Sequence, residues 1–195
     1  MHNFFPISIH PHFCIIVTLS MFVLPIPLVF GWMIAAAIHE ICHLSMLLFL
    51  KVKVLSVSVG ATGALIKTEP MSPVQELLSA LAGPVGALLL LFCLRTMPYI
   101  AISAAIQSFY NLLPVYPLDG GRAVKCAIVC FVGEDKAAKT SNVLSSVVLI
   151  FVLMCGIWMS YYYQLGVLPI VFPLVPLLGT AWKNTLQREK NNCRI

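Results

Sequence analysis

The residues best suited to chemistry form a short motif, His39-Glu40-Ile41-Cys42-His43, in a stretch of chain that is otherwise apolar. On a helix, the two histidines of an HExxH motif lie one turn apart on the same face, where both can bind one zinc ion. Glu40 can then act as the general base toward water at the metal. Residues 31–38 and 44–50 carry no charge, so the motif would lie inside a membrane. Ionisable groups at that depth are costly, and they indicate a functional site.

The composition is that of a membrane protein. Of the 195 residues, 60% are hydrophobic and 10% are charged, and the mean hydropathy is +0.96. A soluble domain has about 25% charged residues, so we expect an all-α polytopic membrane protein. The basic residues that give the net charge of +5 are spread over several loops, and we expect no nucleic-acid partner. The seven cysteines include no CxxC pair, which argues against a disulfide framework or a zinc ribbon.

Six apolar stretches approach the roughly 20 residues that a helix needs to cross a bilayer. They cover about residues 13–30, 31–50, 74–94, 98–117, 143–163 and 166–183. Pro25, Pro27 and Gly31 supply the break between the first two stretches. The fourth stretch ends in Pro114 and Pro117, which disrupt the helix just before Asp119.

The distribution of basic residues predicts the orientation of these spans. With a cytoplasmic N-terminus, eleven of the twelve Lys and Arg residues lie on the inner side, and only Arg95 lies outside. This asymmetry satisfies the positive-inside rule and predicts that both termini are cytoplasmic. The second span then runs inward, and His43 lies about 10 Å from its inner end at 1.5 Å per residue. The ionisable candidates therefore converge on the cytoplasmic half of the membrane.

Residues 51–68, between the second and third spans, have a different pattern. Apolar and polar residues alternate with a period of two on either side of a turn from Gly60 to Gly63, which predicts a β-hairpin. The step from Val54 to Leu55 breaks the alternation and indicates a bulge. The alternative is a loop that rests on the membrane surface.

An HExxH motif supplies two ligands, and a catalytic zinc site usually has three. The chain has only two aspartates, and Asp135 lies in a charged loop where a solvated surface role is the simplest. Asp119 directly follows an apolar helix, after two prolines that stiffen the chain and before two glycines that allow a tight turn. Its alternative role is as an N-cap or turn residue at a helix start. Beside an intramembrane HExxH motif, we expect Asp119 to be the third ligand.

The two motifs together resemble those of the site-2 protease family of intramembrane zinc metalloproteases. The pattern is HExxH in one transmembrane helix followed by N-x-x-P-x-x-P-L-D-G-G in a later one, here residues 111–121. The resemblance covers about residues 30–125, including the hairpin and Ala82-Gly83-Pro84. The small six-span form resembles the sporulation branch, the stage IV sporulation protein FB type.

The resemblance implies one zinc ion per chain and a role for five residues: metal ligands His39, His43 and Asp119, base Glu40, and Asn111 as a residue that positions or stabilises the reacting peptide. Family members often carry an asparagine shortly after the Gly-Pro of the third helix, and Gly83-Pro84-Val85-Gly86-Ala87 has none. We expect one membrane-embedded domain over residues 1–195, with a catalytic core at about 30–125, extra helices at 143–183, and no PDZ or other soluble domain.

Some residues admit two interpretations. Gly83, Gly86 and Ala87 favour close helix packing, although Gly83-Pro84 could instead open a local break that lines the site. Cys42 is expected to be a neutral filler rather than an additional metal ligand. Arg122 is expected either to anchor the inner membrane interface or to contact substrate.

The favoured function is an intramembrane zinc endopeptidase that cuts a membrane-associated protein within or near the cytoplasmic half of the bilayer. The sporulation-type resemblance implies a bacterial cell membrane, a transcription factor released from a pro-sequence, and a regulatory membrane protein as a further partner. A membrane protein that binds or transports divalent metal would place ligands along a path, whereas the candidate ligands here belong to one site. A catalytically inactive scaffold typically loses the base or a ligand, whereas Glu40 and all three ligands are present.

Overall fold

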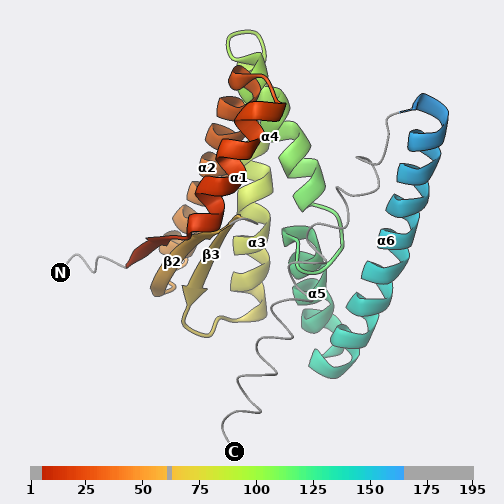
Figure 1. Cartoon of the computed structure of the whole chain (residues 1–195). Coiled ribbons are helices and arrows are strands. Elements are labelled where there is room, and N and C mark those ends of the chain that lie inside the picture. Colours follow the sequence, from red (N-terminus) through yellow and green to blue (C-terminus); the bar gives the residue numbers. More distant parts are fainter. Residues whose placement is uncertain (1–5, 61–62, 165–195) are drawn as a thin grey trace, which may run out of the picture.

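The computed structural model describes residues 6–60 and 63–164. Its elements, in chain order, are β1 (Ile7–Ile9), α1 (Pro11–Val23), α2 (Ile26–Phe49), β2 (Val54–Gly60), β3 (Gly63–Thr68), α3 (Pro73–Leu88), the 3₁₀ helix η1 (Leu89–Cys93), α4 (Pro98–Asn111), α5 (Asp119–Val132) and α6 (Glu134–Tyr163). Helix α2 packs against α3 and α4, and the small sheet lies at one end of these helices (Figure 1). The expected helical architecture with a small β element is confirmed.

Three of the described helical segments are long and apolar enough to cross a membrane: Ile26–Phe49, Pro73–Cys93 and Lys136–Tyr163. Helix α4 has 14 residues. At 1.5 Å per residue this corresponds to about 21 Å, less than the roughly 30 Å thickness of a bilayer core. The sixth predicted stretch, 166–183, lies outside the described residues.

The break between the first two predicted spans lies earlier than expected. Helix α1 ends at Val23 and α2 begins at Ile26, with Pro25 as its N-cap and Pro27 in its first turn. A proline is tolerated there because the first N–H groups of a helix have no partner within the helix. Gly31 lies inside α2, where an added Cβ would come 2.8 Å from the main-chain carbonyl of Tyr99 in α4. Gly31 therefore permits close contact between α2 and α4 and does not break the helix.

Two other helix boundaries differ from the predicted ones. Helix α4 ends at Asn111, because Pro114 cannot donate a helical hydrogen bond and disfavours helical backbone in the residue before it. Helix α6 begins at Glu134 rather than near residue 143. The charged segment that was expected to be a loop forms the first turns of α6. Acidic side chains are favourable there because the N-terminus is the positive end of the helix dipole.

The predicted β-hairpin is confirmed. Strands β2 and β3 pair antiparallel from Gly60↔Gly63 to Val54↔Thr68, with an irregularity between Val54 and Ser56 where the bulge was expected. The sheet has one more strand, β1, which was not predicted because its three residues are too few to show a period. Strand β1 pairs parallel with β2, which gives the order β1-β2-β3. Strand β1 therefore lies at the same end of the molecule as the hairpin.

The end of α2 directs the hairpin back toward the helix. Lys51 has a left-handed backbone (φ 56°). The Lys51 and Val52 N–H groups donate to the carbonyls of Leu48 and Leu47. This is the Schellman pattern of helix termination, and Val52 and Leu47, the two positions that usually make its apolar contact, are both buried. As a result, β3 contacts α2.

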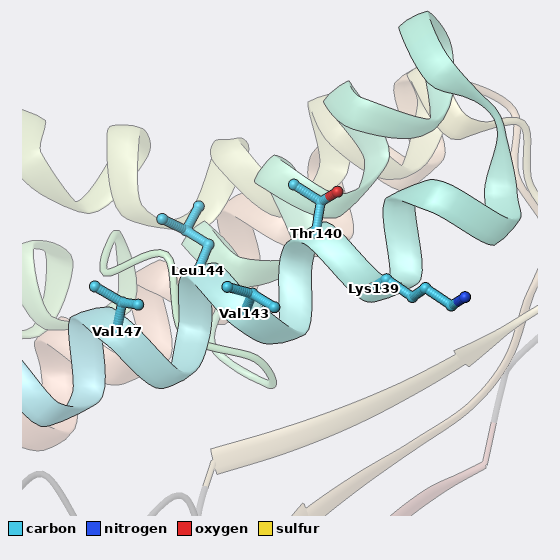
Figure 2. A pocket seen from close by; sticks show the side chains of 5 residues that line it. All are labelled: Lys139, Thr140, Val143, Leu144 and Val147. Atoms are coloured by element: carbon cyan, nitrogen blue, oxygen red, sulfur yellow. The ribbon is translucent and has the colours of Figure 1, made fainter.

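Helix α6 stands apart from the other long helices and packs mainly on α5 (Figure 1). A hollow of about 460 Å³ runs along its first half. Figure 2 shows the five side chains that line it, all from α6: Lys139, Thr140, Val143, Leu144 and Val147. The hollow contains none of the residues expected to bind metal.

Candidate metal centre

The three expected metal ligands meet in space. The two histidine Nε2 atoms lie 3.0 Å apart, and Asp119 Oδ2 lies 3.1 Å from each of them. His39 and His43 are buried, with 4% and 7% of their surface exposed. Within the described residues, these three side chains form the one cluster with the composition and spacing to hold a metal ion. The structure therefore brings together residues 80 positions apart in the chain.

The histidines lie on the buried face of α2. Buried residues recur there at every fourth position: Ala35, His39, His43 and Leu47. In a helix with 3.6 residues per turn, this spacing defines one stripe, which here packs against α3 and α4. The imidazoles thus occupy positions that apolar core residues would otherwise take.

Helix α3 orients His43. The His43 Nδ1–H donates a hydrogen bond to the main-chain carbonyl of Ser79 at 2.7 Å. An added Cβ at Gly83 would overlap the His43 imidazole, so only glycine lets α3 approach this closely. Pro84 lies inside α3, and its missing N–H leaves a carbonyl of the preceding turn, next to Ser79, without a helical partner. Helix α3 nevertheless runs unbroken from Pro73 to Leu88, so the structure supports the close packing at Gly83 and shows no local break at Gly83-Pro84.

Asp119 reaches the histidines from the first turn of α5. The two following glycines do not have positive φ angles, so they do not form the tight turn expected from the sequence. An added Cβ at Gly120 would overlap the backbone of Leu112, and one at Gly121 would overlap the backbone of Val115. The glycines instead let the start of α5 lie directly against the segment that follows α4.

Glu40 faces the hairpin. Its Oε1 accepts a hydrogen bond from the Ala64 N–H at 3.1 Å. Ala64 is paired with Val59 in the hairpin, and an N–H that is used outside the ladder points to the outer edge of β3. The candidate base and the outer edge of the sheet are thus neighbours. The sequence suggested a hairpin but did not indicate this contact.

Helix α4 brings an amide to the cluster. Asn111, its last residue, has Nδ2 3.5 Å from His39 Nε2. One turn earlier, the buried Gln107 donates to the main-chain carbonyl of Trp32 in α2 at 2.9 Å. Gln107 was not singled out in the sequence, although a lone amide in an apolar helix is the kind of residue that forms such a contact. Cys42 points at Gly86 of α3 and packs there, outside the cluster.

The donor atoms have the chemistry and spacing that a zinc ion requires. Since His43 Nδ1 carries the hydrogen that Ser79 accepts, a neutral His43 presents the lone pair of Nε2 to the cluster. The Asp119 carboxylate oxygen also carries lone pairs, so the cluster brings lone pairs of His43 and Asp119 together. On a tetrahedral zinc ion with ligand bonds of about 2.0–2.1 Å, two donor atoms lie roughly 3.3 Å apart. The observed separations of 3.0–3.1 Å are close to that value, and the residues fit the metal.

Comparison with known proteins shows a likeness in fold. No protein-family model matches the chain, and no curated protein matches it. Among solved structures, the chain is similar to the site-2 protease from Methanocaldococcus jannaschii, with 18% sequence identity and a TM-score of 0.62. The alignment covers 93% of this chain and 92% of that protein. Over nearly its whole length, the chain therefore has the fold of that site-2 protease.

Proposed function

We propose that this protein is an intramembrane zinc metalloprotease of the site-2 protease type. The observation that carries the proposal is that Asp119 of α5 meets His39 and His43. The two histidines and Glu40 lie on α2, a helix long and apolar enough to cross a membrane. Four ionisable groups in such a setting would be costly without a function. The likeness in fold to a site-2 protease supports the same conclusion.

The proposed reaction is hydrolysis of a peptide bond in a membrane-associated protein. His39, His43 and Asp119 would hold one zinc ion, which when bound acts as a Lewis acid toward water and the scissile carbonyl. Glu40 takes a proton from the attacking water at a carboxylate oxygen and passes it to the leaving amine. The Asn111 amide donates a hydrogen bond to the oxygen on which negative charge develops. Ser79 keeps the His43 ring in the orientation that presents Nε2.

The outer edge of β3 is the proposed docking site for substrate. A peptide bond inside a helix is shielded, so the substrate must become extended before cleavage. An extended segment can add to an exposed sheet edge by main-chain hydrogen bonds. In an antiparallel ladder, the main-chain N–H and C=O groups of every second residue point away from the partner strand. The N–H of Ile66 therefore lies on the same outer edge as that of Ala64. A strand added there would pass beside Glu40, which already contacts this edge.

Proline at the outer edge tests this docking mode. Ile66→Pro removes an outward N–H while leaving the pairing with β2 intact, and Ile66→Ala keeps the N–H. We expect Ile66→Pro to lower cleavage at least tenfold relative to Ile66→Ala. Equal cleavage by the two variants would exclude pairing at this edge.

The finer proposals follow from the sequence. We propose one catalytic domain over residues 1–195, six spans with cytoplasmic termini, and a bacterial cell membrane. The sporulation-type resemblance favours a membrane-bound precursor of a transcription factor as substrate, and a membrane protein as regulator. A transport function has less support, because the described residues offer one candidate metal group rather than a series along a path.

Cells that express the wild type or Glu40→Gln test the activity. New protein N-termini in the membrane and soluble fractions are identified by mass spectrometry. We expect termini that map within or near apolar spans in wild-type cells and are missing with Glu40→Gln. Identical sets of termini, from equal amounts of zinc-loaded protein, would contradict protease activity toward the proteins of that cell.

A further inference from the structure

The two carboxylate oxygens of Asp119 have different neighbours. Oδ2 faces the two imidazoles, whereas Oδ1 lies 3.7 Å from Nη1 of Arg122, one turn along α5. The other terminal nitrogen of Arg122 donates to Glu76 Oε1 at 3.5 Å. Glu76 lies in the first turn of α3. One guanidinium therefore connects the candidate third ligand to a different helix.

The connection gives α3 a contact with both sides of the cluster. Through Ser79 it orients His43, and through Glu76 and Arg122 it contacts Asp119. Helices α3 and α5 pack against each other, so the Arg122–Glu76 pair bridges two neighbouring helices. A single part-exposed ion pair contributes little to stability, and the Arg122 side chain is 33% exposed. Its effect should therefore concern the direction of the Asp119 carboxylate more than the stability of the fold.

We propose that Arg122 is a positioning residue, which together with Glu76 holds the Asp119 carboxylate so that Oδ2 faces His39 and His43. This inference rests on the proposed metal site. It differs from the two expectations from the sequence, which were an anchor at the membrane interface and a contact to substrate. The planar fork of arginine suits this role, since it can bind two carboxylates from fixed directions.

If Arg122 acts only through its charge, or if instead it positions Asp119, its removal changes the zinc affinity in opposite directions. A guanidinium near the site repels a divalent cation, so if charge alone mattered, its removal would tighten zinc binding. If Arg122 positions Asp119, its removal lets the carboxylate rotate and weakens zinc binding. Loss of residues that orient metal ligands typically costs 10- to 100-fold in affinity. The sign of the change in affinity therefore decides between the two effects.

The experiment measures the zinc affinity of the purified full chain in detergent, by competition with a chromophoric chelator. We expect Arg122→Gln to bind zinc about tenfold more weakly than the wild type. Lys125→Gln is the matched control: it loses the same charge from α5, but Lys125 is exposed and its Nζ lies over the Tyr116 ring. We expect this control to stay within about twofold of the wild type. Arg122→Gln binding as tightly as the wild type, or more tightly, would overturn the inference.

Two further measurements separate positioning from a general loss of structure. Because Glu76 acts through Arg122, adding Glu76→Gln to Arg122→Gln should lower the zinc affinity little further. A second loss of zinc affinity as large as the first would overturn the proposed arrangement. With cobalt in place of zinc, the visible spectrum should differ between Arg122→Gln and the wild type but not between Lys125→Gln and the wild type. Unchanged cobalt spectra for both variants would also overturn it.

The metal site and the positioning role can fail separately. A wild type that binds no zinc would overturn both. A wild type that binds zinc and loses it in Asp119→Ala, while Arg122→Gln binds normally, would overturn only the role of Arg122.

Discussion

Helices α2 and α6 could both cross a membrane, yet their surroundings differ. The most apolar window of α6 has a mean hydropathy of 2.4 and is 6% buried within the protein, whereas that of α2 has a mean hydropathy of 1.5 and is 22% buried. The less apolar helix is thus the more enclosed one. In a membrane, high hydropathy favours contact with lipid, and small or polar residues mark the faces where helices pack and chemistry occurs.

The two helices also carry their charges differently. Glu40 lies in the middle of α2, beside two buried histidines. The charged residues of α6 all lie in its first turns, from Glu134 to Lys139. Substitutions on the enclosed face of α2, or on residues that contact it, should therefore have far larger effects than substitutions on α6.

The largest effect is expected from Glu40→Gln. A glutamine keeps the size of the side chain but cannot take a proton from water, and general bases typically contribute about 100- to 10,000-fold in rate. We expect cleavage of an identified substrate to fall about 1,000-fold, with zinc content unchanged. Cleavage within tenfold of the wild type would remove Glu40 from the role of base.

Asn111→Ala is expected to lower cleavage about 100-fold without a change in zinc affinity, since a single oxyanion donor contributes roughly 100- to 1,000-fold. For Asn111→Ala and the wild type, kcat and zinc affinity are measured on the same preparation of each protein. A variant that loses zinc together with activity would show that Asn111 supports His39 rather than the reacting peptide.

Gly83→Ala tests the contact between α3 and the buried face of α2. The added methyl group would overlap the His43 ring, which must move away from the cluster. We expect zinc affinity to fall about 10- to 100-fold. Gly86→Ala is the matched control, because its methyl group meets Cys42 on the same pair of helices. Equal zinc affinities for the two variants would mean that Gly83 serves packing alone.

The smallest effects are expected on α6. Ala35 on α2 is fully buried, whereas Val147 on α6 is 57% exposed. Ala35→Leu should lower the free energy of unfolding by about 1–3 kcal/mol through overpacking. Val147→Leu should change it by less than about 0.5 kcal/mol. Thermal unfolding in detergent measures both, and a comparable loss in Val147→Leu would mean that this face of α6 is covered by protein.

The sequence predicted those parts of the molecule whose signal is local. The HExxH spacing predicted that His39 and His43 share a helix face, and the alternation around Gly60 predicted the hairpin and its bulge. The convergence of Asp119 on the histidines was expected from the motif, because few polar residues can be placed in an apolar chain without a partner.

Features that depend on contact between distant segments could not be predicted. The hydrogen bonds from His43 to Ser79 and from Ala64 to Glu40 each use a main-chain group, which every residue type carries. Strand β1 is too short to show a pattern. Helix α6 begins earlier than predicted because hydropathy locates the membrane-spanning part of a helix and not its charged first turns.

The most direct test of the metal centre is the zinc content of the purified protein, with wild type, Asp119→Ala and Glu69→Ala measured side by side. Glu69 pairs with Lys53 at the base of the hairpin and controls for the loss of a carboxylate elsewhere. We expect about one zinc ion per chain in the wild type and in Glu69→Ala, and a loss of zinc in Asp119→Ala. A folded wild type without zinc, or an Asp119→Ala variant that keeps it, would contradict the three-ligand centre.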